Sequence, residues 1–344
     1  MGLDAGAPAL TLRGHAGLDE DDIRVRPGRG SRPRTRRRPA HEDAVEAFVA
    51  VVERGRYGCL ADDRMVTAMR ARELGRRGVV VGDRVALAGD TSGAPGTLAR
   101  VVRVEHRTSV LRRSADDSDP VERVIVANAE QLVIVCALVN PPPRPRLIDR
   151  CLVAAYDAGL RPLLWLTKAD LAPPDPLLAA YGPLGVPHAV LGRPHTKAML
   201  ALLREHTAHR VSVLVGHSGV GKSTLVNALV PDAARAVGAV SPVTGRGRHT
   251  SSSAIALPLP GGGWLIDTPG LRGFGLGHVA TDRVVRAFGD LAPGTAACPP
   301  GCTHLEPDCA LDDWVRDQGG DPRLAARLDS LRRLLRSREG GDAD

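Results

Sequence analysis

Residues 211–224, VSVLVGHSGVGKST, constrain the fold of this chain more than any other stretch. The apolar run 211–215 predicts a short buried strand, and it leads directly into residues 216–223, which fit the pattern G-x-x-x-x-G-K-[ST]. Residues 225–229 then carry the start of a helix. Strand, glycine loop and helix form the context that a phosphate-binding loop requires, so we interpret the stretch as one. The alternative is a glycine-rich turn with a surface lysine.

The chemistry expected of this loop follows from its glycines and its lysine. Glycines let backbone N–H groups turn inward around phosphate oxygens, and the helix start adds the positive end of its dipole. Lys222 can reach the β- and γ-phosphates as a catalytic group, and Ser223 can bind Mg²⁺. The predicted nucleotide-binding residues of the loop are Gly216, His217, Ser218, Gly219, Val220, Gly221, Lys222, Ser223 and Thr224.

A second motif indicates which base the nucleotide carries. The predicted strand 162–166 ends in Thr167-Lys168-Ala169-Asp170, close to the Asn-Lys-x-Asp of GTPases. A carboxylate at Asp170 can accept hydrogen bonds from both N1–H and the exocyclic amino group of guanine, whereas adenine has no N1–H donor. The Lys168 stem can lie against the base, and Thr167 takes the place of the usual Asn. Alone, the same four letters also arise from an Asp that starts a helix after a strand.

Two downstream segments are predicted to contact the γ-phosphate and its metal ion. In the motif DTPG at 267–270, Asp267 suits an indirect contact to Mg²⁺ and Gly270 lets the backbone approach the γ-phosphate. Residues 245–252, GRGRHTSS, have the polar, glycine-rich composition of a switch loop. Either Thr250 or Ser251 can complete the Mg²⁺ shell, and the sequence does not decide between them.

The residue after the DTPG motif predicts slow unaided hydrolysis. Ras-like GTPases carry a water-orienting glutamine there, but this chain has Leu271, whose side chain cannot orient water. His249 in the switch loop is the candidate catalytic group that replaces the glutamine. A histidine that only faces phosphate or solvent is the open alternative.

The order of the motifs predicts a circular permutation. In an ordinary GTPase the phosphate loop comes first and the base motif last, whereas here the base motif (167–170) precedes the phosphate loop. From residue 130 onwards, strands and helices alternate, which is typical of a parallel α/β sheet. Before it, residues 43–127 contain about five short strands with glycine-rich turns between them, which predict an OB-type β-barrel.

Arginines dominate the charge of the chain and favour a polyanionic partner. The net charge is +7 and the pI about 9.5. Residues 24–38, RVRPGRGSRPRTRRR, predict a disordered arm that neutralises phosphates, or else a solubilising tail. Barrel arginines can make further phosphate contacts: Arg54, Arg56, Arg100, Arg103, Arg107, Arg112 and Arg113. The predicted helix 322–338 has leucines on one face and arginines elsewhere, which either meet phosphates or form a solvated basic face.

The C-terminal part carries a predicted metal site. Cys298, Cys302, His304 and Cys309 offer three thiolates and an imidazole within twelve positions. This is a closed tetrahedral set of the kind that zinc prefers, and it leaves no open position for water, so we expect one structural Zn²⁺ per chain. Unrelated thiols are the alternative. The remaining cysteines lie in apolar surroundings and read as core thiols: Cys59, Cys136 and Cys151.

These features together resemble the circularly permuted, ribosome small-subunit-dependent GTPase A family. The resemblance covers nearly the whole chain and rests on RTSVLRR, GHSGVGKSTLVNAL, GRGRHTS, DTPG and the Cys/His cluster. It implies GTP hydrolysis stimulated by the 30S ribosomal subunit, contact with 16S rRNA, and a role in late maturation of that subunit. It also implies that residues 216–224 bind phosphate and Mg²⁺ and that Thr167, Lys168 and Asp170 bind guanine. The chain departs from the family at Thr167, at Ser251 and at residues 191–193, where Leu-Gly-Arg replaces a Ser-Ala-type base loop.

We therefore predict an α/β chain with four parts. They are a disordered arginine-rich arm (1–42), an OB-fold barrel (43–127), a circularly permuted P-loop GTPase domain (128–285) and a helical zinc-binding domain (286–344). The sequence begins without an apolar signal segment, and no apolar run approaches the roughly 18 residues of a membrane span, so we expect a cytoplasmic monomer that binds GTP and GDP and no membrane. Two other functions stay open: an ATP-dependent P-loop enzyme, and a non-enzymatic, zinc-stabilised RNA-binding protein with a vestigial nucleotide site.

Overall fold

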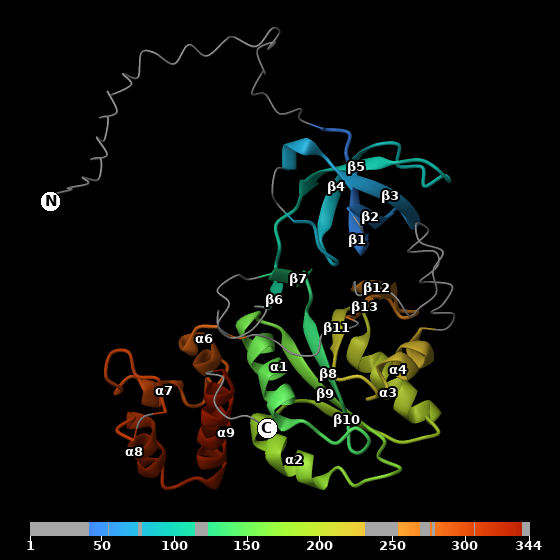
Figure 1. Ribbon diagram of the computed structural model, residues 1–344. Helices are drawn as coiled ribbons and strands as arrows, with labels where there is room; N and C mark the ends of the chain where they lie inside the picture. Colours follow the sequence, from blue (N-terminus) through green and yellow to red (C-terminus); the bar gives the residue numbers. More distant parts are fainter. Residues whose placement is uncertain are drawn as a thin grey trace, which may run out of the picture. The chain divides into compact units, whose positions relative to one another are not determined.

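The structure, a computed structural model, describes residues 41–53, 55–74, 78–113, 123–230, 254–268, 276, 279–305 and 307–338 (Figure 1). The predicted arginine-rich arm lies almost entirely outside these residues. In the described part, residues 41–338 belong to one unit. None of its helices is long and apolar enough to cross a membrane.

Five strands at the start of this unit close into a barrel. They are β1 (Val45–Glu53), β2 (Arg56–Ala61), β3 (Arg64–Arg70), β4 (Arg84–Gly89) and β5 (Ala99–Val104). Their ring order is β1-β2-β3-β5-β4, with β4 returning to β1 and with β3 and β5 parallel. Small aliphatic side chains fill the interior, including Val49, Val85, Leu87 and Val101. The barrel that the sequence predicts is confirmed, and its low aromatic content is explained by this narrow aliphatic core.

The next two strands lie outside the barrel ring. β6 (Val110–Arg113) and β7 (Arg123–Ala127) form a two-stranded antiparallel sheet of their own, joined to the barrel segment by a bridge between Val81 and Val126. Arg107 leads into this hairpin and donates from Nε to the fully buried Asp83 at 2.7 Å. Arg107 is therefore held by a buried carboxylate of the protein itself, a partner that the sequence did not indicate.

A parallel sheet carries the predicted nucleotide motifs. Its strands, in spatial order, are β10 (His188–Leu191), β9 (Arg161–Thr167), β8 (Gln131–Ala137), β11 (Val211–Val215), β13 (Trp264–Asp267) and β12 (Ile255–Pro258). The first five run parallel and β12 is antiparallel. Its helices are α1 (Pro145–Asp157), α2 (Asp175–Tyr181), α3 (Lys197–Thr207) and α4 (Lys222–Leu229), with a 3₁₀ turn η3 (Gly182–Leu184) after α2.

The apolar run of β8 shows why the sheet has helices on both faces. Ile134 and Cys136 belong to the core that contains α1, whereas Val133 and Val135 belong to the core that contains α3 and α4. Side chains alternate across a strand, so a continuous apolar run buries both faces only if both are covered. Figure 1 shows α1 on one side of the sheet and α3 and α4 on the other.

The C-terminal helices pack on the α1 side. They are α6 (Thr281–Arg286), α7 (Ala292–Thr295), α8 (Ala310–Asp317) and α9 (Pro322–Arg338). The last helix has the predicted bounds, and Leu328, Leu331 and Leu335 are buried in the same core as α1. The leucine face predicted from the spacing therefore packs on the helix layer that covers this side of the parallel sheet.

The barrel and the parallel sheet are joined by hydrogen bonding between strands. β1 pairs with β12 at Val51 and Ile255, so the sheet continues into the barrel. The rings of Phe48 and Trp264 stack beside this pairing, with centroids 4.4 Å apart and an interplanar angle of 21°. Two of the few aromatic residues of the chain are thus used at this joint.

Candidate nucleotide and metal sites

One edge of the parallel sheet gathers the predicted nucleotide motifs. Because β9, β10, β11 and β13 are parallel, their carboxyl ends lie at the same edge. The base motif follows β9, the phosphate loop follows β11, and Asp267 ends β13. This edge is where open α/β sheets bind ligands.

Three glycines of the phosphate loop, Gly216, Gly219 and Gly221, have positive φ angles that favour glycine. Gly216 has φ +148°, and a Cβ there would lie 2.3 Å from the carbonyl oxygen of Val135 on the neighbouring strand β8. Gly221 has φ +98°, in the left-handed region, and is the N-cap residue of α4. The loop therefore lies directly against the sheet, and its backbone turns into the helix at the residue before Lys222.

Lys222 is held over the loop by backbone oxygens. Its Nζ donates to the carbonyl oxygen of Gly216 and to that of His217, the latter at 3.0 Å. Burial lowers the pKa of the lysine, and the charge of Asp267 partly opposes the shift. A partly buried ammonium at the mouth of a glycine cradle is positioned to exchange these carbonyl contacts for phosphate oxygens.

The base motif is tied to the phosphate loop. The buried hydroxyl of Thr167 donates to the carbonyl oxygen of Val220 at 2.7 Å, so threonine keeps a contact between the two motifs without the usual Asn. Lys168 has φ +62° and donates to the carbonyl oxygen of Asn140, a partner that the sequence did not indicate. Asp170 is exposed, and its Oδ1 accepts from the backbone N–H of Arg193 at 2.9 Å. In the described part of the chain, its Oδ2 accepts no hydrogen bond.

The predicted switch residues are only partly described. Thr268 is buried and donates to the carbonyl oxygen of Leu214 at 2.7 Å, which fixes the start of the DTPG segment on the phosphate-loop strand. His249, Thr250 and Gly270 lie outside the described residues, so their roles stay predictions.

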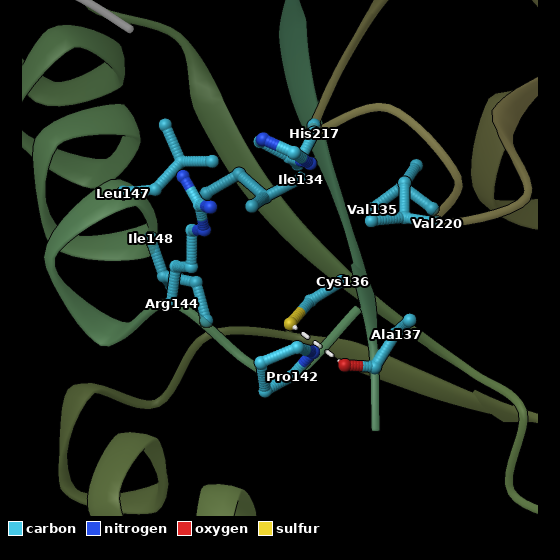
Figure 2. A pocket seen from close by; sticks show the side chains of 11 residues that line it. Ile134, Val135, Cys136, Ala137, Pro142, Arg144, Leu147, Ile148, His217 and Val220 are labelled. Carbon is cyan, nitrogen blue, oxygen red and sulfur yellow. Dashed lines mark hydrogen bonds between the residues drawn. The ribbon is translucent and has the colours of Figure 1, made fainter. Parts of the chain in front are cut away.

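A pocket lies beside the phosphate loop, between the end of β8 and the start of α1 (Figure 2). Its floor is apolar and includes Ile134 and Ile148, and its polar side chains are Arg144 and His217. Burial raises the pKa of the Cys136 thiol on its wall to about 11, which keeps this thiol neutral and unreactive at ordinary pH. Arg144 was not singled out in the sequence, since nothing in the run of prolines around it marks a residue that lies by the phosphate loop.

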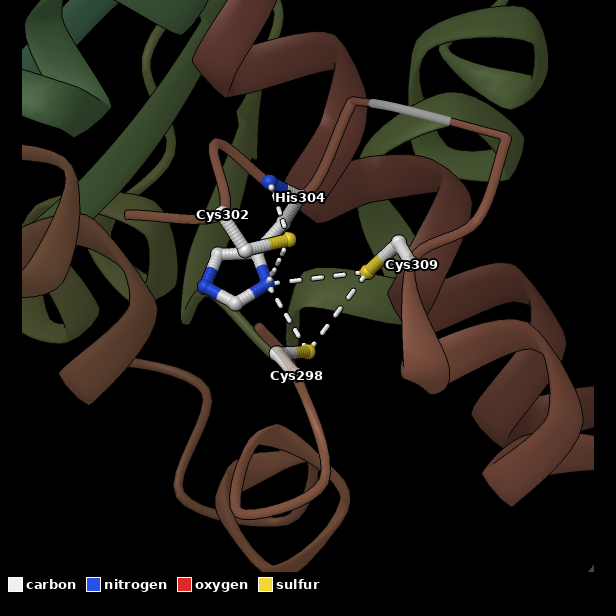
Figure 3. Close-up of side chains that lie close together, drawn as sticks. All are labelled: Cys298, Cys302, His304 and Cys309. Atoms are coloured by element: carbon white, nitrogen blue, oxygen red, sulfur yellow. Dashed lines mark hydrogen bonds between the residues drawn. The ribbon is translucent and has the colours of Figure 1, made fainter. Parts of the chain in front are cut away.

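The four predicted metal ligands converge (Figure 3). The sulfur atoms of Cys298, Cys302 and Cys309 each lie 3.6 Å from His304 Nδ1, and those of Cys298 and Cys309 lie 3.8 Å apart. Zn–S bonds of about 2.3 Å and a Zn–N bond of about 2.0–2.1 Å give tetrahedral edges of about 3.8 Å and about 3.6 Å. The cysteines are free thiols, and the cluster has the dimensions of a site that can hold a metal ion.

Further hydrogen bonds hold this cluster in place. The backbone N–H of His304 donates to Cys302 Sγ at 3.3 Å. Arg332 on α9 donates to the carbonyl oxygen of His304 at 3.2 Å, while its guanidinium also forms a two-pronged pair with Asp312, one bond of which is 2.8 Å. Such surrounding contacts orient metal ligands before a metal binds.

The arginines of α9 are used mostly inside the protein. Arg327 pairs with Asp290 at 2.7 Å and lies over the ring of Phe288, and Arg333 pairs with the buried Asp149 of α1 at 3.2 Å. The arginines predicted to meet phosphates or solvent are Arg323, Arg327, Arg332, Arg333 and Arg336. Three of these five, Arg327, Arg332 and Arg333, instead attach α9 to the rest of the chain. No sequence signal indicated these partners, because they lie far away along the chain.

The phosphate loop follows the inner strand β11 of a parallel sheet, and the base motif lies at the end of β9, a strand that comes earlier in the chain. This arrangement defines a circularly permuted P-loop GTPase. The structure is similar to the crystal structure of YjeQ from Thermotoga maritima (TM-score 0.60, 22% identity, 85% of this chain and 99% of that chain). It is equally similar to the structure of YloQ, a circularly permuted GTPase (TM-score 0.60, 21% identity, 90% and 99% covered).

Sequence comparison gives the family. The RsgA GTPase family profile matches residues 104–277. The Small ribosomal subunit biogenesis GTPase RsgA of Chromohalobacter salexigens is 41% identical over 267 residues, which cover 75% of each chain. The chain belongs to the RsgA GTPase family, and the fold, the permutation and the family resemblance predicted from the sequence are confirmed.

Proposed function

We propose that this protein binds and hydrolyses GTP and that it acts in the maturation of the small ribosomal subunit, in contact with 16S rRNA. The observation that carries the proposal is the junction of the two motifs. Thr167 of the base motif donates to Val220 of the phosphate loop, so a carboxylate suited to guanine and a lysine suited to phosphate belong to one site. The relatives' name, Small ribosomal subunit biogenesis GTPase, supplies the biological setting.

In the proposed mechanism, the chain works by positioning and by charge. Asp170 fixes the base, the loop N–H groups surround the phosphates, and Lys222 donates to β- and γ-phosphate oxygens in place of the loop carbonyls. Ser223 and a switch hydroxyl, that of Thr250 or of Ser251, would hold Mg²⁺, and Asp267 would contact the ion indirectly. Bound Mg²⁺ neutralises the charge that develops on the phosphate oxygens. His249 is the proposed group that orients the attacking water.

The cysteine–histidine cluster is proposed to hold one structural zinc ion. Three sulfurs and one nitrogen at tetrahedral spacing match zinc, and four protein ligands leave no position for a reacting water. The cluster is part of the C-terminal region, whose helix α9 packs on α1, so we expect zinc to stabilise this region and to take no part in hydrolysis.

Phosphate release from GTP with and without purified 30S subunits is the primary test. We expect slow release alone and a large stimulation by the subunit, because Leu271 cannot orient water. We also expect tighter subunit binding with a GTP analogue than with GDP. No release of phosphate in the presence of subunits would favour the alternative of an RNA-binding protein with a vestigial nucleotide site.

Size-exclusion chromatography of the full chain tests the expectation that the protein is a monomer.

Base specificity tests the role of Asp170. The carboxylate accepts two hydrogen bonds from guanine, so Asp170→Ala should lose GTP binding. Asp170→Asn offers an amide N–H in place of one carboxylate oxygen, which suits the C2 carbonyl of xanthine, so this variant should favour xanthosine triphosphate over GTP. The ATP-dependent alternative would be supported if ATP bound as tightly as GTP and if neither substitution at Asp170 changed the affinity for ATP.

Hydrolysis tests the role of His249. The variant His249→Ala should keep the affinity for GTP and lose most of the subunit-stimulated turnover. An unchanged turnover would remove His249 from the mechanism.

A further inference from the structure

Residues 191–194, at the end of β10 and directly after it, lie against the base motif. The N–H of Ala169 donates to the carbonyl oxygen of Leu191 at 3.0 Å, and a Cβ at Gly192 would lie 3.4 Å from the backbone nitrogen of Asp170. The next residue, Arg193, donates its backbone N–H to Asp170 Oδ1 at 2.9 Å. The backbone of Arg193 thus helps to orient the carboxylate that we assign to guanine.

The side chain of Arg193 reaches α4, the helix that follows the phosphate loop. Arg193 Nη2 donates to Thr224 Oγ1 at 3.0 Å, and Thr224 lies in the first turn of α4, two residues after Lys222. Arg193 therefore contacts the base motif through its backbone and α4 through its guanidinium. A nucleotide whose base meets Asp170 and whose β- and γ-phosphates meet Lys222 must pass its ribose and α-phosphate through the space between them.

We propose that Arg193 is a nucleotide-binding residue whose guanidinium donates to the α-phosphate. This inference rests on the proposed GTP function and adds a residue that the motifs do not contain. The side chain is exposed, and no carboxylate pairs with it among the residues that the structure describes. A guanidinium has five N–H donors and keeps its charge, so it can retain the Thr224 contact and still donate to a phosphate oxygen.

The proposal has a specific signature in binding. GTP, GDP and GMP all carry an α-phosphate, so loss of the guanidinium should weaken all three by the same factor and leave kcat nearly unchanged. A charge-assisted hydrogen bond at an exposed position corresponds to a loss of roughly 5- to 30-fold in affinity. Guanosine has the same base and ribose but no phosphate, so its affinity should not change.

The experiment measures the Kd of GMP, GDP and guanosine for the full chain and for Arg193→Ala. Lys197→Ala is the matched control, since Lys197 is also exposed and begins α3, four residues further along the chain. Arg193→Ala should weaken GMP and GDP equally and spare guanosine, Arg193→Lys should recover part of the loss, and Lys197→Ala should match the unaltered chain.

Two results would overturn the inference while the proposed function stands. One is GMP and GDP affinity within twofold of the unaltered chain in Arg193→Ala. The other is an equal loss for guanosine, which would mean that Arg193 acts only through Asp170 and the base. If the unaltered chain binds none of these guanine compounds, the proposed function fails and the inference fails with it.

Discussion

Replacing Arg333 by alanine should loosen the attachment of α9 to α1. Arg333 Nε lies 3.2 Å from Oδ1 of Asp149, and its guanidinium also donates to the carbonyl oxygen of Ala180 at 3.1 Å and lies 4.7 Å from the ring centroid of Tyr181. The carboxylate side chain is only 5% exposed. The variant therefore leaves a buried negative charge without its cation.

The loss of stability expected for Arg333→Ala can be estimated from the burial of Arg333 and Asp149. Removing one member of a buried ion pair destabilises a protein by about 3–5 kcal/mol. The side chain of Arg333 is 34% exposed, so water already screens part of the interaction, and we expect a loss of about 2–4 kcal/mol in the free energy of unfolding. Arg336→Ala is the matched control on the same helix, because Arg336 is exposed and has no carboxylate partner among the described residues; its effect should stay below about 0.5 kcal/mol.

The loss should also depend on pH. Burial raises the pKa of Asp149, and the charge of Arg333 lowers it, so removing Arg333 raises this pKa further. A carboxyl group whose pKa is higher in the folded than in the unfolded protein lowers the free energy of unfolding only while it is ionised. The loss of stability therefore disappears as the pH falls through the raised pKa. The deficit of Arg333→Ala relative to the unaltered chain should therefore be larger at pH 8 than at pH 5.

Urea unfolding of the full chain at both pH values measures these differences. Adding Asp149→Asn to Arg333→Ala removes the unpaired charge and should recover part of the lost stability at pH 8. The reasoning is refuted if Arg333→Ala and Arg336→Ala behave alike, or if Asp149→Asn lowers the stability of Arg333→Ala further.

Substitutions at three other positions test the sites directly. Cys302→Ser should lower the zinc content measured per chain and destabilise the C-terminal region, and full metal content would contradict the zinc assignment. Gly216→Ala should weaken GDP binding at least about tenfold, because its Cβ would lie 2.3 Å from the carbonyl oxygen of Val135; unchanged binding would mean that the loop can move away from the sheet. Thr167→Ala removes the bond to Val220 and should weaken GDP binding by about 1 kcal/mol, whereas Thr167→Ser should retain it.

Features encoded by neighbouring residues could be predicted from the sequence. The strand Val211–Val215 and the helix Pro322–Arg338 have the predicted bounds, because apolar spacing and proline or glycine at the ends are local signals. The metal cluster was predictable for the same reason, since all four ligands lie within twelve positions. The permutation followed from the order of two motifs.

Contacts between distant segments could not be predicted. Thr167 and Val220 are 53 positions apart, and Arg333 and Asp149 are 184 apart, so no periodicity or spacing links them. The leucines of α9 indicated a helix with one buried face, but an arginine beside that face can meet either water or a carboxylate of another element. The fold determines which of these partners an arginine meets, and it places a carboxylate of another segment beside Arg327, Arg332 and Arg333.

The ion pairs of the α9 arginines also weaken the electrostatic field that a distant polyanion experiences. Four of the five arginines between positions 323 and 336 have a carboxylate within 4.0 Å, and the exception in the described part of the chain is Arg336. A guanidinium next to a carboxylate produces the field of a dipole, which fades with distance faster than that of a lone charge. Long-range attraction must then originate at cations that have no carboxylate partner among the described residues, such as the exposed Arg56 and Arg100 on the barrel. Counting the basic residues along α9 therefore overestimates the attraction of this helix for RNA.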